Sequence, residues 1–187
     1  QPTGACSAGR VMAGDGLAWL PDGRAVIGDA WGNGVIEMSD PTSASCQGRP
    51  IAGTQIAIDS GDLMSGQICE QGGVVGPGAQ ARFRRPDDAT GDAQGNVYVY
   101  DDSNMSVKKI ASDAAHTVTK LADLPAGMNT INSMTAMNGK LYVGVGENTD
   151  AAQSQSLESL LGKLLRLNAD GSIPADNPFL AATTGNR

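Results

Sequence analysis

Three segments of the chain repeat one pattern of hydrophobic and polar positions. Each has a run of mainly apolar residues, a short polar turn that ends in glycine, and a second run rich in β-branched or aromatic residues. The segments are residues 17–27, 88–99 and 133–143, with turn glycines at Gly23, Gly95 and Gly139. Asp, Gln or Asn stands before each glycine, and such pairs suit the positive φ angles of tight hairpin turns. The pattern therefore predicts three β-hairpins.

A third apolar run follows each hairpin after a polar connection, at residues 34–38, 106–110 and 163–167. Recurrence of a whole three-strand unit over roughly 40 to 50 residues is typical of propeller blades and favours them over a β-sandwich. We therefore expect an all-β chain that forms about three blades of a β-propeller, at approximately residues 10–70, 71–125 and 126–187. The innermost strands are expected near residues 16–20, 88–92 and 131–137.

One segment departs from the strand pattern. Leu157, Leu160, Leu161 and Leu164 have the spacing of one apolar helix face, and Gly162 stands where such a helix would end. We therefore predict a short helix over about residues 152–161 that leads into a strand.

The composition agrees with a turn-rich β protein and limits its partners. The 187 residues include 25 glycines and 9 prolines, and only 4% are aromatic. Twenty acidic residues against 13 basic ones give a net charge of −7, which disfavours binding to nucleic acid or to an anionic membrane surface. No apolar run reaches the roughly 18 residues that a membrane-spanning helix needs. We expect no nucleic-acid partner and no membrane span.

Oxygen-bearing side chains gather directly after the second strand of the third hairpin, at Glu147, Asn148 and Asp150. Propeller loops at such strand ends converge on a central pocket, where carboxylates can hold a hard cation and amides can bind a polar cofactor. Glu147 and Asp150 are therefore candidate metal ligands, and Asn148 is a candidate cofactor contact. The alternative interpretation is a hydrated loop of turn-forming residues.

Three neighbouring arginines, Arg82, Arg84 and Arg85, have the chemistry to clamp a carboxylate or a phosphate. Asp87 and Asp88 follow directly and nearly cancel the local charge. A solvated or internally paired face is therefore the favoured interpretation.

Two further polar groups are assigned structural roles. His116 is the sole histidine of the chain, and its polar surroundings indicate a surface loop rather than a proton carrier. The run from Asp101 to Asn104 lacks the glycine and glutamate of a calcium loop and is interpreted as a turn.

The most specific signal lies at residues 160–179, with the sequence LLGKLLRLNADGSIPADNPF. This stretch resembles the signature of the glucose/sorbosone dehydrogenase family, the quinoprotein sugar dehydrogenases with a six-bladed β-propeller. Residues 141–148 and 16–24 are also similar to that family, whereas residues 73–110 are more similar to an NHL repeat, another type of propeller blade. The resemblance implies that the chain supplies about half of a six-bladed ring.

The resemblance also implies a chemistry. Members that oxidise sugars bind pyrroloquinoline quinone (PQQ) with calcium near the propeller axis, and a histidine acts as the general base. Asn148 and Gln155 match family residues at the cofactor, but Gly91 and Asp92 stand where the histidine is expected. The implied function is oxidation of a sugar or polyol with PQQ, with no catalytic residue assigned. The alternative is a non-catalytic NHL-like propeller used for binding or extracellular assembly.

The chain ends at Arg187, where the family continues into further blades and where a trypsin-like protease could cleave. Three blades alone would leave two apolar faces in water and would be unstable. We therefore expect these faces to be covered by the remainder of the protein's own propeller or by other copies in an assembly.

The exported character of the resembled family implies an extracellular or periplasmic location, with the signal peptide already removed. In such an oxidising compartment two of the three cysteines are expected to pair, with Cys46 or Cys6 bonded to Cys69 and one thiol left free. The alternative is three reduced, buried cysteines that act as small hydrophobic residues.

Overall fold

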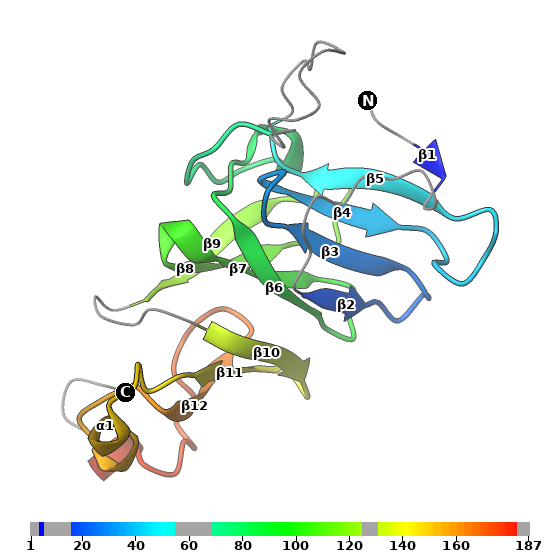
Figure 1. Ribbon diagram of the computed structural model, residues 1–187. Helices are drawn as coiled ribbons and strands as arrows, with labels where there is room; N and C mark the ends of the chain where they lie inside the picture. The colour runs from blue at the N-terminus through cyan, green and yellow to red at the C-terminus, as the bar shows by residue number, and fades with distance from the viewer. Residues whose placement is uncertain (1–3, 6–15, 55–68, 125–130, 183–187) are drawn as a thin grey trace. The chain divides into compact units, whose positions relative to one another are not determined.

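The computed structural model describes residues 4–5, 16–54, 69–124 and 131–182. In these ranges the chain forms three antiparallel β-sheets (Figure 1). It divides into two compact units, Gln1–Asp123 with the first two sheets and Leu124–Arg187 with the third. The all-β class is confirmed, because the described ranges contain a single α-helix, of five residues. The predicted blade boundaries stay a prediction.

The strands follow one another in the sheets nearly in chain order. The orders are β1-β5-β4-β3-β2 in the first sheet, β6-β7-β8-β9 in the second and β10-β11-β12 in the third. The first sheet contains β1 (Gly4–Ala5), β2 (Leu17–Trp19), β3 (Ala25–Asp29), β4 (Gly34–Met38) and β5 (Gln47–Ala52). The second contains β6 (Pro86–Gly91), β7 (Val97–Asp101), β8 (Ser106–Ile110) and β9 (Val118–Asp123). The third contains β10 (Ile131–Met137), β11 (Lys140–Val145) and β12 (Lys163–Asn168).

The three predicted hairpins are confirmed. They are formed by β2 with β3, β6 with β7, and β10 with β11, all antiparallel. The turn glycines have positive φ angles, 86° at Gly23, 81° at Gly95 and 70° at Gly139. Residues with a Cβ adopt such angles only at a cost, so the glycines allow the chain to reverse within a few residues.

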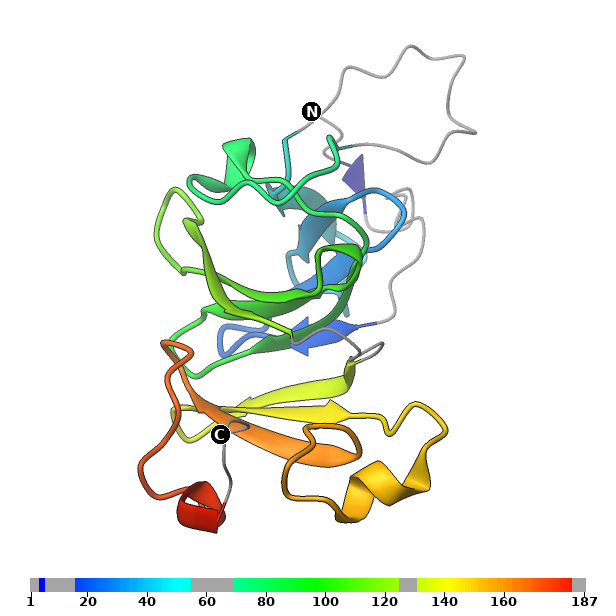
Figure 2. The ribbon, with the colours of Figure 1, turned by 90° about the vertical axis from the view of Figure 1, so that its left-hand side faces the viewer.

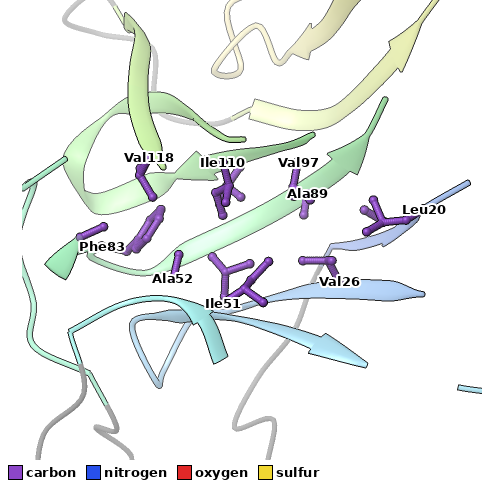
Figure 3. Packing of buried hydrophobic residues seen from close by; sticks show 13 residues of the cluster. Leu20, Val26, Ile51, Ala52, Phe83, Ala89, Val97, Ile110 and Val118 are labelled. Atoms are coloured by element: carbon purple, nitrogen blue, oxygen red, sulfur yellow. The ribbon is translucent and has the colours of Figure 1, made fainter. Parts of the chain in front are cut away.

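The core of the first unit lies between its two sheets (Figure 3). On the side of the first sheet, Leu20, Val26 and Ile51 point toward Val97 and Ile110 of the second sheet. Burial of each large apolar side chain contributes about 1.5–3 kcal/mol. All five residues of β7 are buried, so this strand is covered on both faces and shows no alternation of polar and apolar residues.

The two sheets of the first unit approach each other backbone to backbone at Gly28 in β3. A Cβ built on Gly28 would lie 2.9 Å from the carbonyl oxygens of both Pro86 and Asp87, closer than real Cβ contacts. Glycine is required there because of this close approach, and its φ angle plays no part.

A buried ion pair joins β7 to β8. The Lys108 ammonium lies 2.6 Å from Oδ2 of Asp101, and the two side chains are 1% and 0% exposed. Lys108 also donates a hydrogen bond to the carbonyl oxygen of Arg82 at 2.7 Å and sits 4.5 Å from the centre of the Phe83 ring. Asp101 accepts further hydrogen bonds from the Arg84 amide and from Asn104. The pair thus ties the segment before β6 to the β7–β8 hairpin.

The 101–104 segment is structural, as predicted. Residues Asp102–Asn104 form the short 3-10 helix η2, and the Asp101 carboxylate is engaged by Lys108 and Asn104. Two other 3-10 turns, η1 (Gly78–Gln80) and η3 (Leu180–Ala182), complete the elements of the chain's described part.

In the second unit, β11 alternates between half-buried and buried residues, as expected for a sheet packed on one face. Leu141, Val143 and Val145 are its buried residues. Figure 2 shows that the segment between β11 and β12 extends from one end of this sheet and carries α1 (Ala151–Gln155).

The predicted helix over residues 152–161 is wrong in its extent. The helix observed is α1, which ends at Gln155, and the next residues form turns before β12 begins at Lys163. Leu164 belongs to β12 and is 72% exposed. The four leucines therefore lie partly in turns and partly in a strand, and they do not share a helix face.

The predicted pairing of Cys69 with Cys46 or Cys6 is wrong. Cys46 is disulfide-bonded, whereas Cys69 is a free, buried cysteine. Cys6 lies outside the described residues. The Sγ atom of Cys69 packs against Gly34 and Gly53, where an added Cβ would lie 2.9 Å and 2.8 Å from it.

No helix in the described ranges has the length and apolar character needed to cross a membrane.

We predict that Lys108→Ala destabilises the protein by about 3–5 kcal/mol, because it leaves the Asp101 carboxylate buried without its partner. Urea denaturation of the protein in its full natural length measures the effect. Lys120→Ala is the matched control, because Lys120 pairs with Asp123 on an exposed surface and its loss should cost less than about 1 kcal/mol. Equal effects of the two variants would contradict the structural role of the Asp101–Lys108 pair.

We also predict that the Cys69 thiol of the folded protein resists iodoacetamide at pH 8. Burial, with a contribution from Asp29, raises the pKa of Cys69 to about 12, and only the thiolate reacts. Because the folded-state pKa is raised, the contribution of the neutral thiol to stability is lost only as pH rises from about 9 towards 12. Peptide mass spectrometry should find Cys69 alkylated after denaturation, and rapid alkylation before denaturation would refute the prediction.

Candidate functional site

The candidate site of the second unit is the loop between β11 and β12, residues 146–162. The amide of Gly162 donates a hydrogen bond to the carbonyl oxygen of Gly146 at 3.2 Å and closes the base of the loop. Next to this closure, Asn148 and Thr149 have φ angles of 55° and 64°. Two consecutive non-glycine residues in this left-handed region show that the surrounding contacts impose the turn.

Asp150, a predicted metal ligand, caps α1. One carboxylate oxygen accepts a hydrogen bond from the Ala152 amide at 3.2 Å, and the other accepts one from the Gln153 side chain at 3.0 Å. These are the usual duties of an N-cap aspartate. Both oxygens of Asp150 thus hold the start of α1.

The other predicted residues lie on the same loop. Glu147 and Asn148 are half-buried at the start of the loop, and Gln155 is exposed at the last position of α1. Within the described ranges, no group of three or more His, Cys, Asp or Glu side chains is arranged to hold a metal ion. The metal assignment of Glu147 and Asp150 stays a prediction without geometric support, as does the cofactor assignment of Asn148 and Gln155.

Lys163 is a loop-positioning residue that sequence reasoning missed. Its ammonium donates hydrogen bonds to three carbonyl oxygens, those of Gln153, Ser154 and Leu161, at 2.7–2.9 Å. The first two belong to the end of α1, so a positive charge satisfies carbonyl groups that a helix end leaves without partners. The Gly-Lys pair in the quoted motif was the available signal. Lys163 fixes the loop that carries Asn148 and Gln155.

Asp92, which stands where the resemblance implies a histidine, has its carboxylate engaged by neighbouring residues. One of its carboxylate oxygens accepts hydrogen bonds from the Gln94 and Asn96 amides, and the other accepts one from the Tyr98 hydroxyl, all at 2.9 Å. Asp92 therefore anchors the β6–β7 turn. The sequence has Gly91 and Asp92, and no histidine, at the position where the resemblance places the base.

His116 lies in the β8–β9 connection with a φ angle of 48°. Partial burial, followed by the nearby Arg49 guanidinium, lowers the pKa of His116 below its usual value. The neutral ring is favoured, and the absence of a catalytic role stays a prediction.

The three arginines do not form one clamp. Arg82 pairs with Glu70, and Arg85 lies 3.5 Å from Asp102. Among the described residues, Arg84 makes no ion pair. Internal pairing thus holds for two of the three side chains.

Comparison with known proteins decides the family. The sequence profile of the glucose/sorbosone dehydrogenases matches residues 15–187. The chain belongs to this family. A 42-residue stretch is also 48% identical to aldose sugar dehydrogenase YliI of Escherichia coli (strain K12), covering 22% of this chain and 11% of that protein.

Solved structures agree on the fold. The PQQ-bound aldose sugar dehydrogenase of Streptomyces coelicolor matches 95% of this glucose/sorbosone dehydrogenase family chain, with a TM-score of 0.59 and 18% identity. The apo-form of the soluble aldose sugar dehydrogenase of E. coli matches 99%, with a TM-score of 0.57 and 18% identity. The three sheets are therefore blades of a β-propeller, as predicted. The chain spans 52% of the length of each of these two proteins.

We predict that Lys163→Met loosens the loop while leaving the third sheet intact, because the carbonyl oxygens at the end of α1 lose their charged donor. Hydrogen–deuterium exchange should show the amides of Ser156 and Gly162 exchanging at least tenfold faster. The control is Lys140→Met, because Lys140 bonds Asn168 in the same sheet and does not contact the loop carbonyls. Unchanged exchange in Lys163→Met would show that Lys163 does not hold the loop.

Proposed function

We propose that the protein is a PQQ-dependent dehydrogenase that oxidises a hydroxyl of a sugar or polyol. The observation that carries the proposal is the family match over residues 15–187, which includes the whole loop fixed by Lys163. PQQ, when bound, supplies the acceptor for two electrons from the substrate. One similar structure contains PQQ.

The residues of the loop fit PQQ through neutral groups. The side-chain amides of Asn148 and Gln155 can donate N–H hydrogen bonds to quinone or carboxylate oxygens. Asn148 is held in a left-handed turn beside the closed loop base, which fixes its backbone before any ligand binds. The Lys163 ammonium already donates hydrogen bonds to three carbonyl oxygens. In this proposal the loop therefore orients the cofactor through its amides, and Lys163 does not bind the cofactor.

A non-catalytic binding propeller is the second candidate. It is favoured by Gly91 and Asp92, because neither offers a free base where the catalytic histidine is expected and Asp92 is used by the β6–β7 turn. Calcium remains part of the first proposal only through the family resemblance.

We further propose that more propeller covers the exposed apolar side chains of each unit. Leu17 and Trp19 on β2 are 51% and 54% exposed, and Leu164 and Met137 in the third sheet are 72% and 52% exposed. Such exposure on sheet faces is typical of surfaces that other elements cover. The covering sheets would come from the rest of the protein's own propeller or from other copies.

An extracellular or periplasmic location is also proposed. It is supported by the disulfide at Cys46, because disulfides persist mainly in oxidising compartments.

The test is reconstitution of the protein, in its full natural length, with PQQ and calcium, followed by the reduction of an electron-acceptor dye with glucose and other aldoses. We predict that Asn148→Ala and Gln155→Ala each lower kcat/KM at least tenfold, because each removes a hydrogen bond to the bound cofactor. Gln94→Ala is the matched control, since Gln94 is exposed in the β6–β7 turn.

Absence of PQQ binding by the wild-type protein would refute the proposed oxidation and favour the binding propeller. PQQ binding with equal activities in all three variants would leave the oxidation standing and remove Asn148 and Gln155 from the site.

A further inference from the structure

A pocket of about 580 Å³ lies within the first unit. Its polar and aromatic lining is formed by Trp31, Asn33, Gln71, Arg84, Arg85 and Ser103. These residues come from the β3–β4 turn, the segment before β6 and the η2 turn between β7 and β8, whose strands are labelled in Figure 1.

The backbone of the two arginines is fixed by four hydrogen bonds. The Arg84 amide donates to Oδ1 of Asp101 at 2.7 Å, and the Arg85 amide donates to Oδ1 of Asn33 at 3.2 Å. Their carbonyl oxygens accept hydrogen bonds from the Ser103 amide at 3.0 Å and from the Asp102 amide at 3.1 Å. The pocket wall is therefore pre-organised, with parts of both sheets of the first unit holding it.

Arg85 is held in a conformation that an arginine seldom adopts. Its φ angle is 59°, in the left-handed region that costs a non-glycine residue about 1 kcal/mol or more. Glycine or asparagine would satisfy the turn more easily, so the turn itself does not explain an arginine here. Backbone strain at the wall of a pocket is typical of ligand sites.

The charges at the pocket are only partly balanced. The Arg85 guanidinium lies 3.5 Å from Asp102, and both side chains keep contact with solvent at 57% and 17% exposure. Arg84 is exposed and has no ion pair among the residues that the structure describes. The pocket thus offers a guanidinium, the group that binds carboxylates by two parallel hydrogen bonds.

Trp31 supplies a flat apolar surface beside this charge. Its side chain is 65% exposed, although tryptophan normally buries its large ring. The turn that carries it is fixed, because the Gly32 amide donates to Oδ1 of Asp29 at 3.0 Å and Asn33 donates to the Trp31 carbonyl oxygen at 3.4 Å. An exposed indole on a fixed turn can stack on the apolar face of a sugar ring.

We propose that this pocket binds a carbohydrate that carries a carboxylate, such as a hexuronate. Arg84 binds the carboxylate, the Trp31 ring stacks on the pyranose, and Gln71 and Ser103 hydrogen-bond the hydroxyl groups. The chain has a negative net charge, so it does not attract anions in general. Binding of the carboxylate therefore depends on the local groups of the pocket. The inference needs neither PQQ nor the proposed oxidation.

The test is isothermal titration of the protein, in its full natural length and without PQQ, with D-galacturonate. Binding should weaken at least tenfold in Arg84→Gln and in Trp31→Ala, and should remain unchanged in Arg49→Gln. Arg49 is a matched control because it is similarly exposed, pairs with Glu37 and does not line the pocket. D-Galactose, acetate and D-galactose 6-phosphate are titrated in parallel.

Galacturonate should bind at least tenfold more tightly than galactose or acetate, because only galacturonate engages both Arg84 and Trp31. Tighter binding of the 6-phosphate than of galacturonate would overturn the carboxylate assignment. Absence of galacturonate binding, or binding that Arg84→Gln leaves unchanged, would overturn the site. Circular dichroism of each variant shows that a loss of binding does not come from unfolding.

Discussion

The first unit depends on the buried ion pair between Asp101 and Lys108. Two opposite charges that are almost fully excluded from water require every remaining hydrogen-bonding position to be filled. The structure fills them with the Arg82 carbonyl oxygen, the Arg84 amide and Asn104. Because these groups belong to the segment before β6 and to η2, the electrostatic requirement of one hairpin fixes the path of a neighbouring segment. That segment carries the arginines of the pocket.

The strands and turns were predictable because they depend on local chemistry. A polar residue followed by glycine between two apolar runs specifies a hairpin whatever the rest of the chain does, and Gly23, Gly95 and Gly139 all adopt the expected positive φ angles. The predicted helix at residues 152–161 was wrong because Leu164 belongs to β12, so the leucines share no helix face. The Lys163 ammonium binds three carbonyl oxygens beside the end of α1, and no periodicity of apolar residues reports such a contact.

The candidate sites were predictable only in part. The loop with Glu147, Asn148 and Asp150 was found from its polar residues, but the capping role of Asp150 required coordinates. For the arginines, Asp87 and Asp88 in the sequence suggested neutralisation, whereas the ion pairs observed join Arg82 to Glu70 and Arg85 to Asp102. The disulfide at Cys69 was predicted from the oxidising compartment that the resemblance implies. The close contacts of Cys69 with Gly34 and Gly53 join residues 35 and 16 positions apart, and the spacing of the cysteines does not reveal them.

The close approach at Gly28 has a consequence for how the gene can vary. Every other amino acid carries a Cβ, which would meet the Pro86 and Asp87 carbonyl oxygens. Those oxygens belong to backbone and cannot swing aside as a flexible side chain would. A non-synonymous change of this codon therefore pushes two blades apart, even when it introduces alanine. Position 28 therefore does not tolerate any substitution. At Gly23 an added Cβ would meet no atom within 4 Å, so only the positive φ angle disfavours substitution there.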